Sequence, residues 1–339
     1  MRERAEALAA VFPRERLDPA VVAWAARPGR ARWGLAFSGG ADSLALVLLV
    51  WALWPGCRRR LVVLHFNHRL RGPAARADAA FCRRVCSQLG LRFVTAAWAG
   101  RRTGASEAEA REARLKFLRR YARVLWFGHQ RDDVAETMLM RLARGSGAGG
   151  LAAPRPVQTF VGGRVHLRPL LRLRHEELTR ALRVAGIGWR EDATNATGVY
   201  QRNRVRRDVL PRWERAAGRD AVAGAARSRE LLEEDDAALE GWLDRLRPLD
   251  ARGRLDLVRL RGAPRAVLRR ALHRWVLANP PAAVLSRAAF DTLLQQVEAG
   301  ARTRQSAGRA WFAVSDGRRL FLQAAPRAGR SKSARGRPN

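Results

Sequence analysis

Short apolar runs that alternate with helical patterns constrain the fold of this chain more than any other feature of its sequence. The runs cover Trp33–Phe37, Leu61–Phe66, Leu91–Val94 and Val124–Phe127. Each is short enough for a strand, and the segments between them carry apolar residues at helical spacing. Strands that alternate with helices are typical of a doubly wound, mostly parallel sheet. We therefore predict an α/β domain over residues 1–215, with a short helix before the first strand.

The alternation stops around residues 210–220, and the remaining chain predicts a second, smaller domain. Helical spacing continues over Arg227–Leu246, Pro264–Leu277 and Ser286–Glu298. Two apolar runs, Trp311–Val314 and Leu320–Gln323, flank an Asp-Gly turn, which favours a hairpin. We predict a mainly helical domain over residues 216–324 that ends in this hairpin. Residues 325–339 are basic and poor in apolar side chains, so we expect a disordered tail there.

The charge balance indicates a polyanionic partner. The chain has 65 Lys and Arg residues against 31 Asp and Glu residues, a net charge of +34. Codon bias can explain why nearly all of the basic residues are arginine, but it does not explain the surplus. A surplus of this size favours nucleic acid as the partner. No long apolar run predicts a membrane span, and no signal segment is apparent, so we expect a cytoplasmic protein.

Cysteine usage argues against a disulfide framework. The chain has three cysteines, Cys57, Cys82 and Cys86, an odd and sparse set. Cys82 and Cys86 are four residues apart on a predicted helix, and no second pair accompanies them. We therefore expect buried thiols in the core rather than a metal or iron–sulfur site.

Polar segments follow three of the predicted strands, and they should lie together. They are Ser38-Gly39-Gly40, His65-Phe66-Asn67-His68 and Gly128-His129. In sheets of this kind, ligands bind beyond the carboxyl ends of the strands. Glycines at a strand-to-helix turn let backbone N–H groups approach an anion, and the start of the helix adds to the site. The segment lacks the lysine and the spacing of the common GxxxxGK[ST] phosphate loop.

The loop Ser38-Gly39-Gly40-Ala41-Asp42-Ser43 resembles the SGGxDS pyrophosphate loop of the N-type ATP pyrophosphatases, the PP-loop family. The resemblance implies an adenine nucleotide alpha hydrolase-like fold that binds ATP and Mg²⁺, with Asp42 as a metal ligand. Members of the family activate a carbonyl by adenylation and release pyrophosphate. They include enzymes of amide synthesis, tRNA thiolation and tRNA lysidine formation, so this loop does not choose among them.

A second segment is more discriminating. His129, Asp133 and Glu136 follow one another at offsets of 4 and 3, which places them on one face of a helix. Two carboxylates and an imidazole beside a phosphate site can bind Mg²⁺ or a cationic amine. The stretch from Gly128 to Thr137, followed by Arg144-Gly145-Ser146-Gly147, resembles lysidine synthetases.

Other segments also resemble lysidine synthetases, and they occur along the chain in the same order as in that family. Leu115 is a departure, because the family pattern has an aromatic residue at that position. These segments are His65–Gly72, Glu107–Arg114, Arg168–Leu171, Asp192–Asn195 and Arg202–Arg206. By resemblance, Asp133 and Glu136 recognise lysine, and His129 lies near the adenylation centre. The residues expected to bind ATP are Ser38, Gly39, Gly40, Asp42, Ser43, His65, Arg111 and Gly128. Those expected to take part in catalysis are Asp42, His129, Asp133, Glu136 and Arg202.

The resemblance implies an ATP-dependent ligase that joins free L-lysine to the wobble cytidine of tRNA(Ile) with a CAU anticodon. The path runs through an adenylated tRNA and yields AMP, pyrophosphate and lysidine. A tRNA thiolase of the same family is the main alternative, although Cys82 and Cys86 lack the Cys-x-x-Cys spacing common in such enzymes. A small-molecule amide synthetase and a non-catalytic RNA-binding protein are further alternatives. A homodimer is compatible with the sequence.

Overall fold

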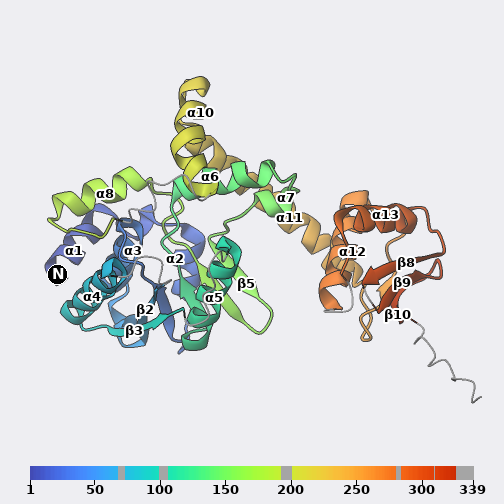
Figure 1. Ribbon diagram of the computed structural model, residues 1–339, viewed down its shortest axis with the longest axis horizontal. Helices are drawn as coiled ribbons and strands as arrows, with labels where there is room; N and C mark the ends of the chain where they lie inside the picture. The colour runs from blue at the N-terminus through green and yellow to red at the C-terminus, as the bar shows by residue number, and fades with distance from the viewer. Residues whose placement is uncertain (68–72, 99–105, 192–200, 280–283, 309, 326–339) are drawn as a thin grey trace, which may run out of the picture. The chain divides into compact units, whose positions relative to one another are not determined.

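A computed structural model describes residues 1–67, 73–98, 106–191, 201–279, 284–308 and 310–325 of the chain (Figure 1). The chain forms two compact units, Met1–Glu233 and Glu234–Asn339. The units therefore divide inside a long helix, α11 (Ala221–Leu246), whereas the sequence suggested a domain limit at residue 215. The functional limits of the domains stay a prediction. The tail predicted for residues 325–339 lies, beyond Ala325, outside the described residues.

The first unit is built on a six-stranded sheet with the order β3-β2-β1-β4-β6-β5. Neighbouring strands are parallel except β5 and β6, so the predicted doubly wound, mostly parallel sheet is confirmed. The strands are β1 (Trp33–Ala36), β2 (Leu61–Asn67), β3 (Arg92–Ala97), β4 (Val124–Trp126), β5 (Val157–Phe160) and β6 (Arg164–Leu167). The strand order reverses at β1, which lies between β2 and β4. A ligand crevice is expected at that reversal.

The helices of this unit cover both faces of the sheet. They are α1 (Arg2–Val11), α2 (Pro19–Ala25), α3 (Ala41–Leu53), α4 (Pro73–Leu89), α5 (Glu107–Tyr121), α6 (Arg131–Leu142), α7 (Ala148–Leu151), α8 (His175–Val184), α9 (Gln201–Arg204), α10 (Leu210–Ala217) and the first half of α11. One leading helix was predicted from residues 1–30, but the structure has two. Pro13 and Pro19 divide them, because proline starts a helix well and cannot continue one.

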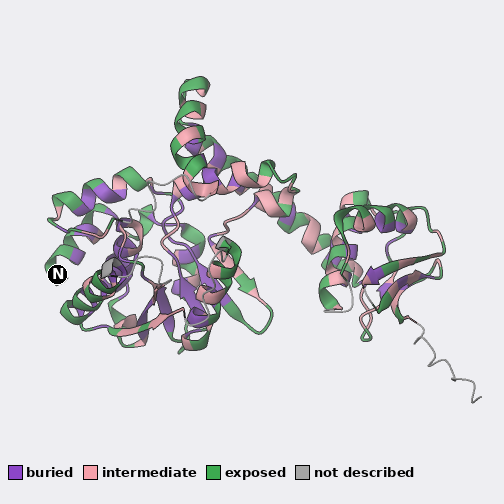
Figure 2. Ribbon diagram, in the orientation of Figure 1, coloured by how far each residue is buried: buried purple, intermediate pink, exposed green. Residues whose placement is uncertain are grey.

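Alternate residues of β2 enter different cores, which explains why the strand is apolar throughout. Leu61 and Val63 pack with α3, whereas Val62 and Leu64 pack with α5 on the opposite face. Helix α3 is buried from Leu44 to Val50, as expected for a helix that is apolar on every side. Buried residues accordingly concentrate in the central strands (Figure 2). This packing fixes the start of α3, and with it the glycine loop.

The antiparallel hairpin of β5 and β6 was not predicted. Its strands contain polar residues such as Gln158 and His166, so they lack the apolar runs that marked the other strands. Gly162 and Gly163 close the hairpin with positive φ angles, which glycine adopts without strain. The hairpin adds an edge next to β4 and brings Arg168, the residue after β6, to that side of the sheet.

The second unit combines helices with a four-stranded sheet of order β7-β10-β9-β8. Its other elements are α12 (Arg265–Ala278), α13 (Arg287–Glu298), β7 (Leu255–Asp256), β8 (Thr303–Gly308), β9 (Trp311–Ser315) and β10 (Arg319–Ala324). The predicted hairpin is confirmed as β9 and β10, while β7 and β8 are additional strands. No helix among the described residues is both long and apolar enough to span a membrane.

Candidate functional site

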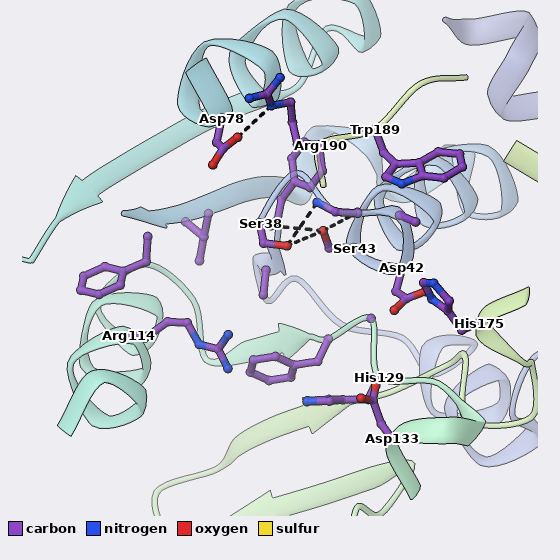
Figure 3. Close-up of a pocket in the computed structure, with 18 of the residues that line it drawn as sticks. Ser38, Asp42, Ser43, Asp78, Arg114, His129, Asp133, His175, Trp189 and Arg190 are labelled. Carbon is purple, nitrogen blue, oxygen red and sulfur yellow. Dashed lines mark hydrogen bonds and ion pairs between the residues drawn. The ribbon is translucent and has the colours of Figure 1, made fainter. Parts of the chain in front are cut away.

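A cavity of about 780 Å³ lies at the carboxyl ends of the central strands (Figure 3). Its wall contains the glycine loop after β1, the segment after β4, and side chains from α5, α6 and α8. The predicted site residues that line it are Ser38, Gly40, Asp42, Ser43, Gly128, His129 and Asp133. The fold therefore brings together residues that are up to 95 positions apart in the sequence, between Ser38 and Asp133.

The glycine loop is held in shape by its own serines. Ser43 Oγ donates to the carbonyl of Gly40 at 2.9 Å and accepts from the backbone N–H of Ser38 at 3.2 Å. The two hydroxyl groups, Ser38 Oγ and Ser43 Oγ, are 3.0 Å apart. Gly39 has a φ of 99°, a conformation that strongly favours glycine. The loop leads directly into the first turn of α3, so its N–H groups form a ready-made anion site.

Gly128 allows the end of β4 to approach the start of α3. A β-carbon at this position would lie 2.7 Å from the carbonyl oxygen of Asp42 and 3.1 Å from Ser43 Cα. Both are backbone atoms that cannot swing away. The position of the glycine loop therefore depends on the missing side chain of Gly128.

Arg190 and Asp78 support the loop, and sequence reasoning missed both. The backbone N–H of Arg190 donates to the carbonyl of Gly39 at 2.9 Å. Its guanidinium Nε donates to Asp78 Oδ1 at 2.8 Å, across 112 residues of sequence. Both side chains line the cavity. Because they lie in unrelated segments, no local pattern could have paired them.

Asp42 has a partner that the sequence did not reveal. His175, the first residue of α8, places Nδ1 at 2.7 Å from Asp42 Oδ1. This hydrogen bond raises the pKa of His175. The backbone N–H of His175 also donates to Asp132 Oδ2 at 2.9 Å, so α3, α6 and α8 meet at this point.

No group of three metal-binding side chains occurs among the described residues. Asp42 could still hold Mg²⁺ together with nucleotide phosphates, which is how Mg²⁺ commonly binds.

The two carboxylates of α6 have different environments. Asp133 lines the cavity, whereas Glu136 is fully buried and does not. Arg206 Nε donates to Glu136 Oε1 at 2.5 Å, and its Nη2 lies 3.3 Å from Asp133 Oδ1. Arg202 Nε is 3.1 Å from Glu136 Oε2. The sequence therefore located the carboxylates, but the structure shows that arginines already neutralise them.

Burial raises the pKa of Asp133, and its neighbour Asp42 acts in the same direction. Burial likewise raises the pKa of Glu136, with repulsion from Asp133 as the next cause. Arg202 and Arg206 oppose both shifts, because a nearby cation favours the charged carboxylate.

His129 is a neutral imidazole in this environment. Burial lowers the pKa of His129 well below its ordinary value, and repulsion from Arg168 and Arg202 lowers it further. Its Nδ1 is buried and has no hydrogen-bond partner in the described part of the chain. The imidazole is therefore suited to donate a hydrogen bond to a bound ligand, or to accept one from it, rather than to carry charge.

Other predicted site residues lie beside the cavity rather than in its wall. His65 is buried, and its Nδ1 is 2.9 Å from the carbonyl oxygen of Phe37, so it ties β2 to the end of β1. Arg111 is exposed on α5, and Arg114 of the same helix lines the cavity instead. Arg202 contacts Thr137 Oγ1 at 2.9 Å as well as Glu136. The segments at 68–72 and 192–200, which include Asn195, lie outside the described residues.

The expectation of core thiols is confirmed for Cys82 and Cys86, which are completely buried and free. Burial raises the pKa of Cys86 to about 12 and raises the pKa of Cys82 as well.

Because the thiolate is the reactive form, we predict that iodoacetamide at pH 8 modifies Cys57 alone in the folded chain. Peptide mass spectrometry would check this. Modification of all three thiols after unfolding is the control, and rapid native alkylation of Cys82 would contradict the prediction.

Comparisons with known proteins agree with this geometry. Residues 15–213 match the model of the PP-loop domain family. A tRNA(Ile)-lysidine synthase from Salinispora tropica is 38% identical over 266 residues, covering 75% of this chain and 79% of the relative. The chain belongs to the tRNA(Ile)-lysidine synthase family.

Other members of the tRNA(Ile)-lysidine synthase family are longer than this chain. The relative from Symbiobacterium thermophilum is 39% identical over 214 residues, which cover 60% of this chain and 44% of the relative. The chain thus spans about half the length of several relatives that it matches. Among solved structures, a U34-tRNA thiolase from Methanococcus maripaludis has a TM-score of 0.51 at 17% identity, covering 68% of this chain and 78% of the thiolase. This similarity shows a shared fold.

Proposed function

We propose that the chain makes lysidine on tRNA(Ile) with a CAU anticodon, using ATP and free L-lysine. The observation that carries the proposal is a single cavity with a PP-loop anion site on one wall and Asp133 of α6 on another. Membership of the tRNA(Ile)-lysidine synthase family supports it, and so does the net charge of +34, which suits an RNA substrate. We also propose a cytoplasmic location, which suits a tRNA substrate.

The proposed reaction has two steps. The C2 carbonyl oxygen of the wobble cytidine attacks the α-phosphorus of ATP, and pyrophosphate leaves. The lysine ε-nitrogen then forms a bond to C2, the C2–O bond to AMP breaks, and the amine loses its protons. Each step is helped chiefly by positioning and by neutralising the charge that develops.

The residues of the cavity suit these steps. The N–H groups of the Ser38–Ser43 loop would hold the phosphates of ATP. Asp42 would hold Mg²⁺, which neutralises phosphate charge when it is bound. Asp133, on another part of the cavity wall, would pair with the lysine ammonium, and its raised pKa suits it to accept a proton from that group. His129, held neutral, would donate or accept a hydrogen bond near the reacting carbonyl.

A direct assay tests the proposal. The purified chain is incubated with Mg·ATP, radiolabelled lysine and a tRNA(Ile) transcript with a CAU anticodon. We expect lysine to become attached to the RNA, with AMP released in equal amount. A transcript whose wobble cytidine is replaced by uridine is the control and should accept none. Folded protein that transfers no lysine to the CAU transcript would contradict the proposal.

The same preparation distinguishes the alternatives. A thiolase would incorporate sulfur, but Cys82 and Cys86 are in the core and do not line the cavity. A small-molecule amide synthetase would exchange ATP and pyrophosphate without RNA. Binding of tRNA without release of AMP in the presence of lysine would favour a non-catalytic RNA-binding protein. The homodimer stays a prediction that analytical ultracentrifugation can test.

A further inference from the structure

One cation in the cavity wall differs from the rest. His175 pairs with Asp42 at 2.7 Å, and Arg190 pairs with Asp78 at 2.8 Å. Arg206 pairs with the carboxylates of α6. These three basic side chains therefore each have an acidic partner. The fourth, Arg114 of α5, makes no hydrogen bond or ion pair with the described part of the chain.

The side chain of Arg114 is half-buried and lacks a partner. Its Nε is buried and unpartnered. Figure 3 shows it extending from α5 into the space between the glycine loop and His129. A buried guanidinium without a counter-ion is costly, so a fold usually pairs it or binds an anion there. The cost is visible in the pKa of Arg114, which burial lowers to about 10.

Neighbouring arginines increase the positive potential instead of cancelling it. Arg111 and then Arg202 are the charges that act on Arg114 most strongly, and both are positive. Arg168 is 5% exposed, lies 5.7 Å from the ring of Phe127, and donates to the carbonyl of Arg155 at 2.6 Å. That carbonyl is neutral, and the attraction that Glu233 exerts on Arg168 is weaker than the repulsion from Arg111 and Arg141. This side of the cavity therefore attracts an anion.

We propose that Arg114 forms a second phosphate subsite in the cavity, separate from the Ser38–Ser43 loop. An arginine can give a phosphate two parallel N–H donors, and its charge attracts the anion from solution. Under the proposed function, on which the identity of the ligand rests, two substrates carry phosphate. The group that binds Arg114 is either a phosphate of ATP or a backbone phosphodiester of the tRNA next to the wobble nucleotide.

Two binding measurements on the full chain separate these sources. The first is the affinity for Mg·ATP without RNA, and the second is the affinity for the CAU transcript without ATP at several salt concentrations. Loss of a charged hydrogen bond predicts a roughly 10- to 100-fold weaker complex for Arg114→Ala. If the ligand is ATP, the affinity for ATP falls and the salt dependence for tRNA is kept. If the ligand is RNA, tRNA affinity falls and the slope of log K against log salt decreases by about 1.

Arg120→Ala is the matched control, because Arg120 is an exposed arginine on the same helix. It should change neither measurement appreciably. Arg114→Gln keeps a polar side chain without the charge and serves if Arg114→Ala fails to fold, as judged by circular dichroism. Folded Arg114 variants that bind both ATP and tRNA as Arg120→Ala does would overturn the subsite. A change confined to the KM for lysine would overturn it too, because the anion would then be a carboxylate.

Neither measurement depends on lysine transfer. A chain that makes no lysidine, yet loses affinity for ATP or tRNA in Arg114→Ala, would contradict the proposed function and support the phosphate subsite. A chain that makes lysidine, and whose folded Arg114 variants bind ATP and tRNA as before, would support the proposed function and contradict the phosphate subsite. The two proposals can therefore fail separately.

Discussion

Gly128→Ala is expected to lower the rate of ATP-dependent lysine transfer at least about 100-fold, because a displacement of about 1 Å at a reaction centre can cost that much. The new β-carbon would lie 2.7 Å from the carbonyl oxygen of Asp42 and 2.9 Å from its carbonyl carbon. Backbone cannot rotate out of the way, so either β4 or the first turn of α3 must move. The glycine loop, which leads into that turn, moves with it.

The measurement is the single-turnover rate with saturating ATP, together with the affinity for ATP. Overpacking of this kind typically destabilises a fold by about 1–3 kcal/mol, so urea unfolding is measured in parallel to show that the variant is folded. Gly56→Ala is the matched control in the same unit, since nothing lies within 4 Å of a β-carbon there. Wild-type rate and ATP affinity in Gly128→Ala would show that the contact does not position the loop.

The second large effect is expected at Glu136, where truncation to alanine should reduce the free energy of unfolding by roughly 2–4 kcal/mol. Removing one partner of a buried ion pair commonly costs about 3–5 kcal/mol, because it leaves the other charge without compensation. Here Glu136 is fully buried and forms ion pairs with Arg206 and Arg202. Arg206 is 42% exposed, so water can solvate part of its charge, and we expect the lower range.

Urea unfolding followed by circular dichroism would measure this loss. Glu176→Ala is the control, since Glu176 is 79% exposed and pairs with Arg180 on the helix surface, an arrangement worth only a few tenths of a kcal/mol. Because Arg206 lines the cavity, lysine transfer by Glu136→Ala should also fall under conditions where the variant is folded. Equal urea midpoints for Glu136→Ala and Glu176→Ala would contradict the prediction, because the ion pairs of Glu136 with Arg202 and Arg206 would then not stabilise the fold.

Several parts of the fold could be predicted because their signals are local. The strand β2 is apolar at every position from Leu61 to Leu64, and a strand buried on both faces leaves such a run. The hairpin of β9 and β10 follows from an Asp-Gly turn between two apolar runs, and the register pairs Phe321 with Val314. By contrast, β5 and β6 form an edge hairpin with polar residues, and their sequence contains no comparable signal.

The candidate site likewise has parts that the sequence could predict and parts that it could not. The glycine loop and the face of α6 that bears Asp133 and Glu136 are short segments whose spacing shows the geometry directly, but His129 precedes α6 and does not lie on the predicted helix face. Arg111 and Arg114 lie on the same helix, and spacing could not decide which of them reaches the cavity. The sheet decides it, because α5 packs on one face through Leu115 and Leu118, and this sets the rotation of the helix. Arg114 then points inward, and Arg111 remains exposed.

The sequence by itself determined the α/β alternation, the Ser38–Ser43 loop and the carboxylates of α6, because each depends on neighbours within a few residues. Only the tertiary structure decided the partners of those groups. The contact between Asp42 and His175 spans 133 residues, and that between Asp78 and Arg190 spans 112. Such contacts arise when separate strands and helices pack against one sheet. The same packing leaves Arg114 in the cavity wall without a counter-ion, because no acidic side chain of the described chain reaches it.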